Sequence, residues 1–365
     1  MEAVKRKYEG KDGYRQVTAN NVHVCTTMAC NNKLRLGVIG TGHMAARYAR
    51  SWVTMPEVAF VAVSDVNAAS RRKFTDICRN AGRPEPREFD DFKSMIAACR
   101  DELDAIYVST PHALHAEHGI AVVEAGLDLL MEKPMVTTVE EAQRLISARD
   151  KSRSHVAIAF QGALSPLVAN TRQRARAGEF GELVSVAGTI WENWSSRYAG
   201  HWKQRLDLSG GGFMFDTGAH MMNTVCLLAD VDCERVSAFM SNRQRSVDVV
   251  CAVAGRLTTG ALLTLNAAGD GPSGCSSQIT FFYTEAMVRI DAWGAWREIA
   301  VAGAPAVREE VEIMDNPLKS FLSIRAGDAE NLSTLEAGLR FARLWDAIKG
   351  SAARDGEPVA VWPSA

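Results

Sequence analysis

Between Leu34 and Phe160, short apolar segments alternate with stretches of helical periodicity, and this alternation limits the possible folds more than any other feature of the sequence. Short apolar strands that alternate with helices are typical of a parallel sheet covered by helices on both faces. We therefore predict an α/β domain with a doubly wound parallel sheet over residues 34–160. The predicted strands are Leu34–Ile39, Val58–Ser64, Asp104–Ser109, Leu127–Met131 and His155–Phe160, and the predicted helices are His43–Val53, Ser70–Asn80, Leu114–Glu124 and Val139–Arg149.

Residues 161–365 have a different pattern, because strand-like runs follow one another from Val236 to Ile299 with few helices between them. Successive strands without crossover helices favour an antiparallel sheet, so we predict an α+β domain with a large open antiparallel sheet. Residues 1–33 are charged and lack periodicity, which predicts an N-terminal extension that is partly disordered. The other predicted elements are a helix over Val168–Arg176, a strand over Leu183–Trp191, one long apolar helix after Gly210–Gly212 that continues through Leu228, and a last helix over Thr334–Lys349.

Composition excludes several classes of protein. The 365 residues are 47% hydrophobic and 23% charged, which is typical of a globular protein, and the net charge of -2 gives no basis for binding nucleic acid or an anionic membrane. No apolar run reaches the roughly 20 residues of a membrane-spanning helix, and the first residues lack a signal-peptide pattern. Eight scattered cysteines are typical of reduced thiols, so we expect a cytoplasmic protein.

We expect no metal site in this sequence. Cys25 and Cys30 are the one close cysteine pair before the first strand, and no second pair with matching spacing accompanies them. His112, His115 and His118 run from a loop into the start of a helix, without the supporting carboxylates that a metal site needs.

The loop between the first strand and the first helix is Gly40-Thr41-Gly42-His43-Met44-Ala45, a G-x-G-x-x-A sequence. Asp65 ends the next strand at about the 20-residue distance that the dinucleotide-binding fingerprint requires. Gly40 permits the tight turn, Gly42 lets the backbone approach a pyrophosphate, and the helix N-terminus faces the phosphates. The sequence therefore predicts a Rossmann domain.

An acidic residue at position 65 accepts hydrogen bonds from ribose hydroxyls, which favours NAD, while Arg71 and Arg72 leave NADP open. The alternative role for Asp65 is to cap the helix that follows it. The predicted cofactor-binding residues are Gly40, Gly42, His43, Met44, Asp65, Asn67, Ser109, Thr110, Pro111, His115, Glu132 and Lys133.

Three polar residues form the predicted catalytic set: Lys133, Asp216 and His220. Residues just beyond the carboxyl ends of parallel strands converge on the ligand, which places Thr110, His115 and Lys133 beside the nicotinamide. Asp216 and His220 are four residues apart on a predicted helix and so share one face. A neutral imidazole accepts the hydroxyl proton during alcohol oxidation, an ammonium stabilises negative charge on oxygen, and a carboxylate orients either group. The alternative is that these residues only cap a helix or end a strand.

Four segments, in their order along the chain, resemble the Gfo/Idh/MocA family of glucose–fructose oxidoreductases and inositol dehydrogenases. They are LGVIGTGHMA, STPHALH, MEKP and SGGGFMFDTGAH, and the resemblance covers about residues 34–350. It implies a Rossmann domain and an open-faced antiparallel sheet domain that often makes dimer or tetramer contacts. It also implies that Lys133, Asp216 and His220 are the catalytic residues, with His220 as acid/base and Lys133 beside the nicotinamide and the substrate oxygen.

This chain departs from the family at two positions. The family often has Asn where this chain has His112, and its common Trp-Arg pair is Trp202-Lys203 here. We expect neither departure to touch the catalytic set, although both bear on cofactor contacts and on the substrate.

An aromatic segment, Ile190–Trp202, has the composition of a sugar site, because flat rings cover the C–H face of a sugar while amide and guanidinium groups bind its hydroxyls. The alternative is that its aromatic residues belong to the core or to a subunit interface. The positive charges of Arg197 and Lys203 are also compatible with an acidic sugar, such as a uronate, as the substrate. The predicted substrate residues are Trp191, Asn193, Arg197, Tyr198 and Trp202.

The sequence thus predicts an NAD(P)-dependent oxidoreductase that transfers a hydride between nicotinamide and a secondary alcohol or ketone of a sugar, sugar derivative or cyclitol. We expect a homodimer or homotetramer that assembles through the C-terminal sheet. Two alternatives stay open: an NAD-dependent glycoside-cleaving enzyme with the same fold, and a non-catalytic NAD- or sugar-binding protein.

Overall fold

Six parallel strands form the first sheet of a computed structural model that describes residues 33–312 and 316–362. Their order, β3-β2-β1-β4-β5-β6, is that of a dinucleotide-binding doubly wound sheet, which confirms the predicted fold. The strand β3 was not predicted, because it is a short edge strand with two exposed polar residues, Arg87 and Glu88. The strands are β1 (Leu34–Ile39), β2 (Val58–Ser64), β3 (Arg87–Phe89), β4 (Ala105–Val108), β5 (Asp128–Met131) and β6 (Val156–Ile158).

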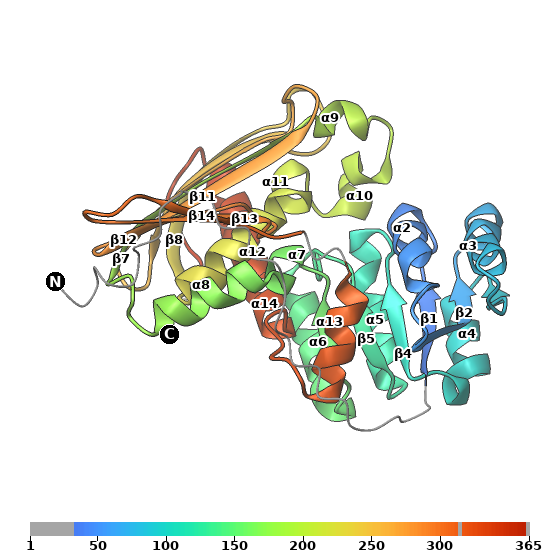
Figure 1. The fold of residues 1–365 in the computed structure, drawn as a ribbon. Coiled ribbons are helices and arrows are strands. Elements are labelled where there is room, and N and C mark those ends of the chain that lie inside the picture. Colours follow the sequence, from blue (N-terminus) through green and yellow to red (C-terminus); the bar gives the residue numbers. More distant parts are fainter. Residues whose placement is uncertain (1–32, 313–315, 363–365) are drawn as a thin grey trace.

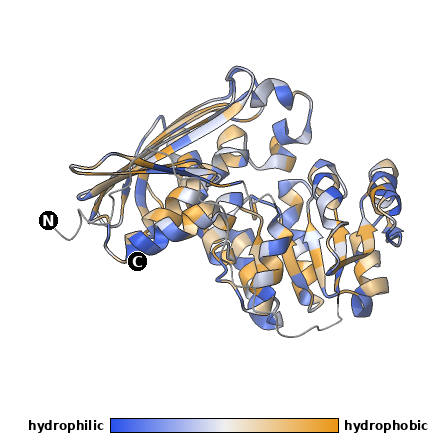
Figure 2. Ribbon diagram, in the orientation of Figure 1, coloured by the Kyte–Doolittle hydropathy of each residue, from blue (hydrophilic) through white to orange (hydrophobic). Residues whose placement is uncertain are grey.

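Helices cover both faces of this sheet, so its central strands are largely apolar, apart from the exposed Arg35 of β1 (Figures 1 and 2). Local signals set some helix ends: Thr138 and Glu141 form a capping box at the start of α6. The helices are α2 (His43–Trp52), α3 (Ala68–Asn80), α4 (Phe92–Cys99), α5 (His115–Glu124) and α6 (Val139–Ser152), with short 3-10 turns η1 (Arg100–Glu102) and η2 (His112–Leu114).

The second sheet has nine strands in the order β14-β13-β12-β11-β7-β10-β9-β8-β15. All of its neighbouring pairs are antiparallel except β7 and β10, so the predicted antiparallel sheet is correct apart from this pair. The exception arises because helices and two strands separate β7 from β10 along the chain, so no hairpin joins them. The strands are β7 (Leu183–Glu192), β8 (Cys233–Ser241), β9 (Val250–Leu257), β10 (Leu262–Ala268), β11 (Cys275–Tyr283), β12 (Ala286–Ile290), β13 (Trp296–Val301), β14 (Val307–Glu310) and β15 (Val359–Ala360).

One predicted helix is divided. The apolar helix expected after the glycine cluster consists of α11 and α12, separated at Thr217, whose backbone stays in the right-handed helical region. The helices of residues 161–362 are α7 (Gln161–Leu164), α8 (Pro166–Arg176), α9 (Trp194–Arg197), α10 (Leu206–Ser209), α11 (Phe213–Asp216), α12 (Gly218–Ala229), α13 (Pro317–Ala326) and α14 (Leu335–Ala352), with the 3-10 turn η3 (Trp202–Gln204).

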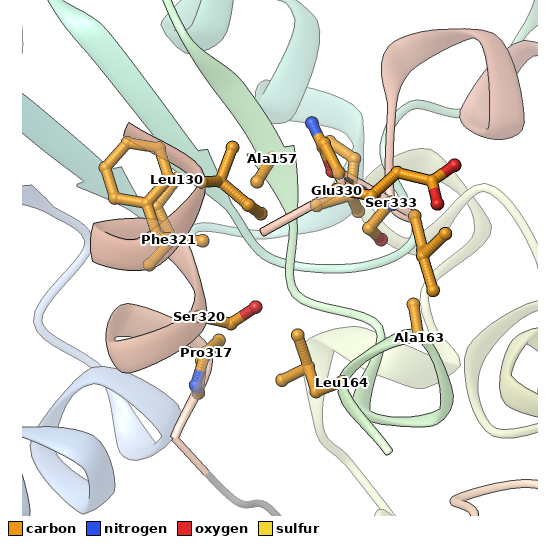
Figure 3. A pocket seen from close by; sticks show the side chains of 13 residues that line it. Leu130, Ala157, Ala163, Leu164, Pro317, Ser320, Phe321, Glu330 and Ser333 are labelled. Atoms are coloured by element: carbon orange, nitrogen blue, oxygen red, sulfur yellow. Dashed lines mark hydrogen bonds between the residues drawn. The ribbon is translucent and has the colours of Figure 1, made fainter. Parts of the chain in front are cut away.

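Near its C-terminal end, the chain returns to the first sheet. Helix α13, which lies beside β5 (Figure 1), buries Leu318 and Phe321 completely in the core that contains Leu36 and Trp52. A small cavity of about 10 Å³ lies beside this helix, with Leu130 and Phe321 among its lining side chains (Figure 3). None of the predicted site residues lines it. Helix α13 therefore completes the packing of the first domain.

Residues 33–312 and 316–362 contain neither a membrane-spanning helix nor a cluster of metal ligands. None of the helices there is both long and apolar enough to span a membrane. In the same residues, histidine, cysteine and acidic side chains nowhere gather in groups of three that suit a metal ion. The predicted extension, with Cys25 and Cys30, lies outside the described residues except for Lys33.

Candidate active site

Two glycines shape the loop between β1 and α2. Gly40 has a φ of +86°, and a Cβ atom there would lie 2.5 Å from the carbonyl oxygen of Ser109. A Cβ atom at Gly42 would meet nothing within 4 Å. No side chain caps α2, and no acidic residue lies in its first turn, so its positive end is available to an anion. His43, at that end, is exposed, and Met44 is half-buried.

Asp65 fastens this loop to the end of β2. Its carboxylate accepts hydrogen bonds of 2.8 Å from the backbone N–H groups of Thr41 and Asn67. The cap of α3 is Asn67, whose side chain accepts from two backbone N–H groups, so the capping role considered for Asp65 belongs to Asn67. Arg71 donates to the carbonyl oxygen of Asp65 and lies 3.5 Å from Glu88. The guanidinium of Arg71 is thus already held by acceptors of the protein.

Histidines support the loop after β4. His115 is completely buried, and its ring nitrogens lie 2.9 Å from the carbonyl oxygen of Thr110 and 2.8 Å from that of Pro134. His118 contacts the hydroxyl of Thr110 at 3.0 Å, and burial lowers its pKa to about 4. His115 therefore ties two loops together from behind, whereas Ser109, Thr110 and Pro111 are half-buried at the loop surface.

A buried cluster of charges surrounds Asp216. Its carboxylate accepts hydrogen bonds from Lys133 at 3.0 Å, from Lys203 at 2.7 Å and from the indole N–H of Trp194 at 2.9 Å. Lys133 also donates to the carbonyl oxygen of Asp216 at 2.8 Å. Burial by itself raises the pKa of Asp216, but the charges of Lys133 and Lys203 outweigh it and hold this pKa well below its usual range. Asp216 is therefore an ionised carboxylate between two ammonium groups.

Both departures from the family lie at this cluster, so the expectation that neither touches the catalytic set is wrong. Lys203 bonds directly to Asp216, and the Nε2 atom of His112 lies 3.9 Å from the same carboxylate. Nδ1 of His112 bonds to the carbonyl oxygen of Ser209 at 2.9 Å. Sequence spacing did not show this, because a short loop with η3 folds back and brings position 203 to position 216.

His220 lies at the start of α12, next to the same charges. Its ring packs between Phe160 and Trp293 and is 8% exposed. Burial, assisted by the charge of Lys133, lowers its pKa well below the usual value, so the imidazole is neutral near pH 7. Its Nδ1 atom is buried and has no hydrogen-bond partner among the described residues. A neutral imidazole thus lies within electrostatic range of an ionised aspartate and two lysines.

Asp248 was not predicted as a site residue. Its carboxylate accepts hydrogen bonds from the backbone N–H groups of Gly212 at 2.6 Å and Met214 at 3.0 Å, and so holds the N-terminus of α11. A Cβ atom at Gly212 would collide with the backbone of Asp248, which explains the glycine. No motif indicated this carboxylate, because it is distant in sequence from the glycine cluster.

Glu132 lies on the core side of the strand end. Its carboxylate accepts a 2.7 Å hydrogen bond from the hydroxyl of Tyr107, and the side chain is buried. Burial raises the pKa of Glu132. Glu132 therefore contacts the aromatic core around Tyr107, whereas its neighbour Lys133 points to Asp216.

The predicted substrate segment divides over the two faces of the second sheet. Ile190 and Glu192 of β7 face the helices, so by alternation Trp191 faces the opposite, open side, away from Asp216. This separates Trp191 from the other four predicted residues. Those follow on α9 and η3, and Asn193 is half-buried where α9 begins.

Arg197, Tyr198 and Trp202 lie nearer the cluster. Arg197 bonds to Glu192 at 2.9 Å and lies 5.4 Å from the centre of the Tyr198 ring. The ammonium of Lys203 lies 4.5 Å from the same ring. The Trp202 ring is edge-on to His112, with 4.8 Å between the ring centres. The structure thus brings Tyr198 and Trp202 to Lys203 and His112, the two neighbours of Asp216, and brings Arg197 to Tyr198.

Comparison with known proteins identifies the family of this chain. A family model described as an oxidoreductase family with an NAD-binding Rossmann fold matches residues 34–160, and the GFO/IDH/MocA C-terminal domain model matches residues 168–289. The chain belongs to the Gfo/Idh/MocA family. As in that family, the Rossmann domain precedes a domain built on a large sheet.

Individual Gfo/Idh/MocA relatives are distant. A glycosyl hydrolase family 109 protein of Saccharopolyspora erythraea is 27% identical over 209 residues, which cover 54% of this chain and 45% of the relative. D-xylose 1-dehydrogenase (NADP(+)) of Haloarcula marismortui is 28% identical over 207 residues and 56% of each chain. The chain spans about half the length of these curated relatives. A levoglucosan dehydrogenase, solved with NADH and levoglucosan, has the same fold, with a TM-score of 0.79 at 20% identity over 91% of this chain and 100% of that one.

Proposed function

We propose that this protein is an NAD(P)-dependent oxidoreductase that transfers a hydride between nicotinamide and a secondary alcohol or ketone of a sugar, sugar derivative or cyclitol. The observation that carries the proposal is the buried contact of Lys133 with Asp216 beside the neutral imidazole of His220. These groups come from a strand end of the Rossmann domain and from two helices of the second domain. Their combination matches the needs of alcohol oxidation.

The loop after β1 fits a dinucleotide. Gly42 leaves space beside the backbone, and the uncapped positive end of α2 suits a pyrophosphate. The proposed cofactor-binding residues are those predicted from the sequence, except that His115 acts from behind the loop and Glu132 contacts Tyr107 on the core side. NAD is favoured over NADP, because Asp65 would repel a 2′-phosphate and Arg71 is already held by Asp65 and Glu88.

Each catalytic side chain has a distinct task. The neutral imidazole of His220 accepts the hydroxyl proton in oxidation and returns it in reduction. Lys133 donates to the reacting oxygen and stabilises its developing negative charge. Asp216 holds the Lys133 ammonium in place through two oxygen atoms. A bound nicotinamide supplies the hydride acceptor or donor.

The test is a spectrophotometric assay of the purified protein with NAD or NADP and a panel of sugars and cyclitols, which follows reduced nicotinamide. We expect turnover, and we expect Lys133→Met and His220→Ala each to lower kcat/KM by at least ~100-fold. Lys93→Met is the control, because Lys93 is a surface lysine that pairs with Glu117. If both site variants keep activity within about tenfold of wild type, the roles proposed for Lys133 and His220 are wrong.

A second candidate is cleavage of a glycoside by transient oxidation. It is favoured by the similarity to glycosyl hydrolase family 109 proteins, three of which are 25–27% identical to this chain. Release of a free sugar from a glycoside without net formation of reduced nicotinamide would support this function over dehydrogenation. Binding of cofactor and sugar without any product would instead indicate a binding protein.

The open face of the second sheet supports a homo-oligomer. Phe239, Leu262 and Phe282 point outward there and are 57%, 56% and 39% exposed. Leu262 and Phe282 flank Ser185 on neighbouring strands. We expect a dimer or tetramer by light scattering, and we expect Leu262→Lys with Phe282→Lys to shift it toward monomer. Val66→Lys, at an equally apolar position outside this sheet, leaves assembly unchanged.

The cysteines support a reducing compartment, which we propose is the cytoplasm. Six cysteines within the described residues are free thiols, four of them buried.

A further inference from the structure

The cluster around Asp216 carries more positive than negative charge. Lys133 lies 3.0 Å from one oxygen of the carboxylate, and Lys203 lies 2.7 Å from the other. The two lysine side chains are only 13% and 18% exposed, and that of Asp216 is 2% exposed. Two ammonium groups thus share one carboxylate in a nearly buried position, which leaves one positive charge without a partner.

Neighbouring acids do not supply the missing negative charge. Glu192 is paired with Arg197 at 2.9 Å, so that pair is neutral. Glu132 bonds to Tyr107, and burial raises the pKa of Glu132, which favours its neutral form. Protonation of His112 would only add positive charge. The excess charge is therefore a property of the whole cluster.

Unused hydrogen-bond donors gather at the same place. Lys203 has three N–H donors, and among the described residues its side chain donates a hydrogen bond to Asp216 alone. Its ammonium lies 4.5 Å from the centre of the Tyr198 ring, and the guanidinium of Arg197 lies 5.4 Å from the same centre. Two cations thus lie over the Tyr198 ring, and the described residues leave N–H donors of both without a protein acceptor.

We propose that the substrate carries a carboxylate, as a sugar acid such as a uronate or an aldonate does. This inference rests on the proposed function and names the substrate class of that site. An unpaired buried charge is costly, and a ligand carboxylate supplies one negative charge and acceptor oxygens for the ammonium of Lys203. A neutral sugar supplies hydroxyl acceptors but leaves the charge unbalanced.

Matched substrate pairs test this proposal, because glucuronate and galacturonate differ from glucose and galactose only at carbon 6. We expect kcat/KM with the cofactor to be at least tenfold higher for an acid than for its neutral partner. We expect Lys203→Met to lower this acid-to-neutral ratio at least tenfold, and Lys203→Arg, which restores the positive charge, to keep it. Lys93→Met is the matched control, because Lys93 also contacts a carboxylate and an aromatic ring, Glu117 and Phe92, but at the surface.

Binding of the same sugars, measured by calorimetry with saturating NADH, separates this inference from the proposed function. Equal or better turnover of the neutral sugars would contradict the proposed substrate carboxylate but would still support the oxidoreductase function. Tighter binding of the acids without any turnover would support a ligand carboxylate and would contradict the oxidoreductase function. If Lys203→Met leaves the acid-to-neutral ratio of kcat/KM unchanged, Lys203 does not have the proposed role. If the protein binds neither the acids nor the neutral sugars, the inference is wrong.

Discussion

The loop at Gly40–Ala45 and the cluster around Asp216 both belong to the candidate site, but different forces shape them. The loop is shaped by its backbone: Gly40 donates to Ser64 at 2.8 Å and approaches Ser109 closely. The cluster is held by buried charges from Lys133, Lys203 and Asp216, which approach one another only in the folded chain. The loop should therefore be sensitive to the shape of a side chain, and the cluster to its charge.

The largest effect is expected from Asp216→Asn, which keeps the shape but removes the charge. Two buried ammonium groups then lose their counter-ion, so we expect a loss of about 3 kcal/mol in the free energy of unfolding and at least ~100-fold in kcat. Urea unfolding and steady-state kinetics measure these losses. The control is Asp230→Asn, because Asp230 also lies between two cations, Arg172 and Arg176, but is 32% exposed. We expect it to cost under about 1 kcal/mol, and equal losses for both variants would contradict the importance of burial.

Two glycine variants separate folding from cofactor binding in the loop. Gly40→Ala places a non-glycine residue at positive φ and brings its Cβ atom against the backbone of Ser109. We therefore expect a loss of about 1–3 kcal/mol in stability as well as weaker dinucleotide binding. Gly42→Ala meets no protein atom within 4 Å, so stability should change by under about 0.5 kcal/mol while the Kd for NADH rises at least tenfold. Thermal unfolding and fluorescence titration with NADH distinguish the two outcomes. Unchanged NADH binding in Gly42→Ala would show that the dinucleotide does not bind at this loop.

His115 connects the two regions, because it contacts the loop at Thr110 and the turn at Pro134, next to Lys133. Replacement of His115 by Phe removes both contacts and leaves buried carbonyl oxygens without partners, at a cost of about 1–3 kcal/mol. We expect KM for the cofactor to rise and kcat to fall together. A variant that loses stability but keeps both kinetic constants would show that His115 is only a packing residue.

A pH-dependent effect, which is small near neutral pH, should follow from the buried His118. Burial lowers the pKa of His118 from 6.5 to about 4, so the unfolded chain binds its proton first as the pH falls. Stability is therefore lost between pH 6.5 and about 4, by up to about 1.4 kcal/mol per pH unit for this histidine. Urea unfolding from pH 7 to 5 measures the slope, which His118→Phe should reduce. His155→Gln, at an exposed histidine, should leave the slope unchanged.

Much of the first domain was predictable, because its signals are local. The bounds of β1 and β2 match the predicted strands, since central parallel strands are apolar on both faces. The G-x-G-x-x-A loop was equally clear, because strand, turn and helix are adjacent in sequence. The predictions failed where tertiary contacts decide, as at the polar edge strand β3 and at the pair of β7 with β10.

The sequence by itself determined the Rossmann fold, the position of the glycine loop and the identity of Lys133, Asp216 and His220 as candidates, because periodicity and motifs are local patterns and the order of the motifs can be read directly along the chain. Only the tertiary structure decided that Lys203 and His112 join Asp216, that Trp191 faces away from it and that Asp248 holds the glycine cluster. The reason is physical: the net charge of a buried site is the sum over side chains that the fold brings together, and their separation in sequence carries no information about that sum.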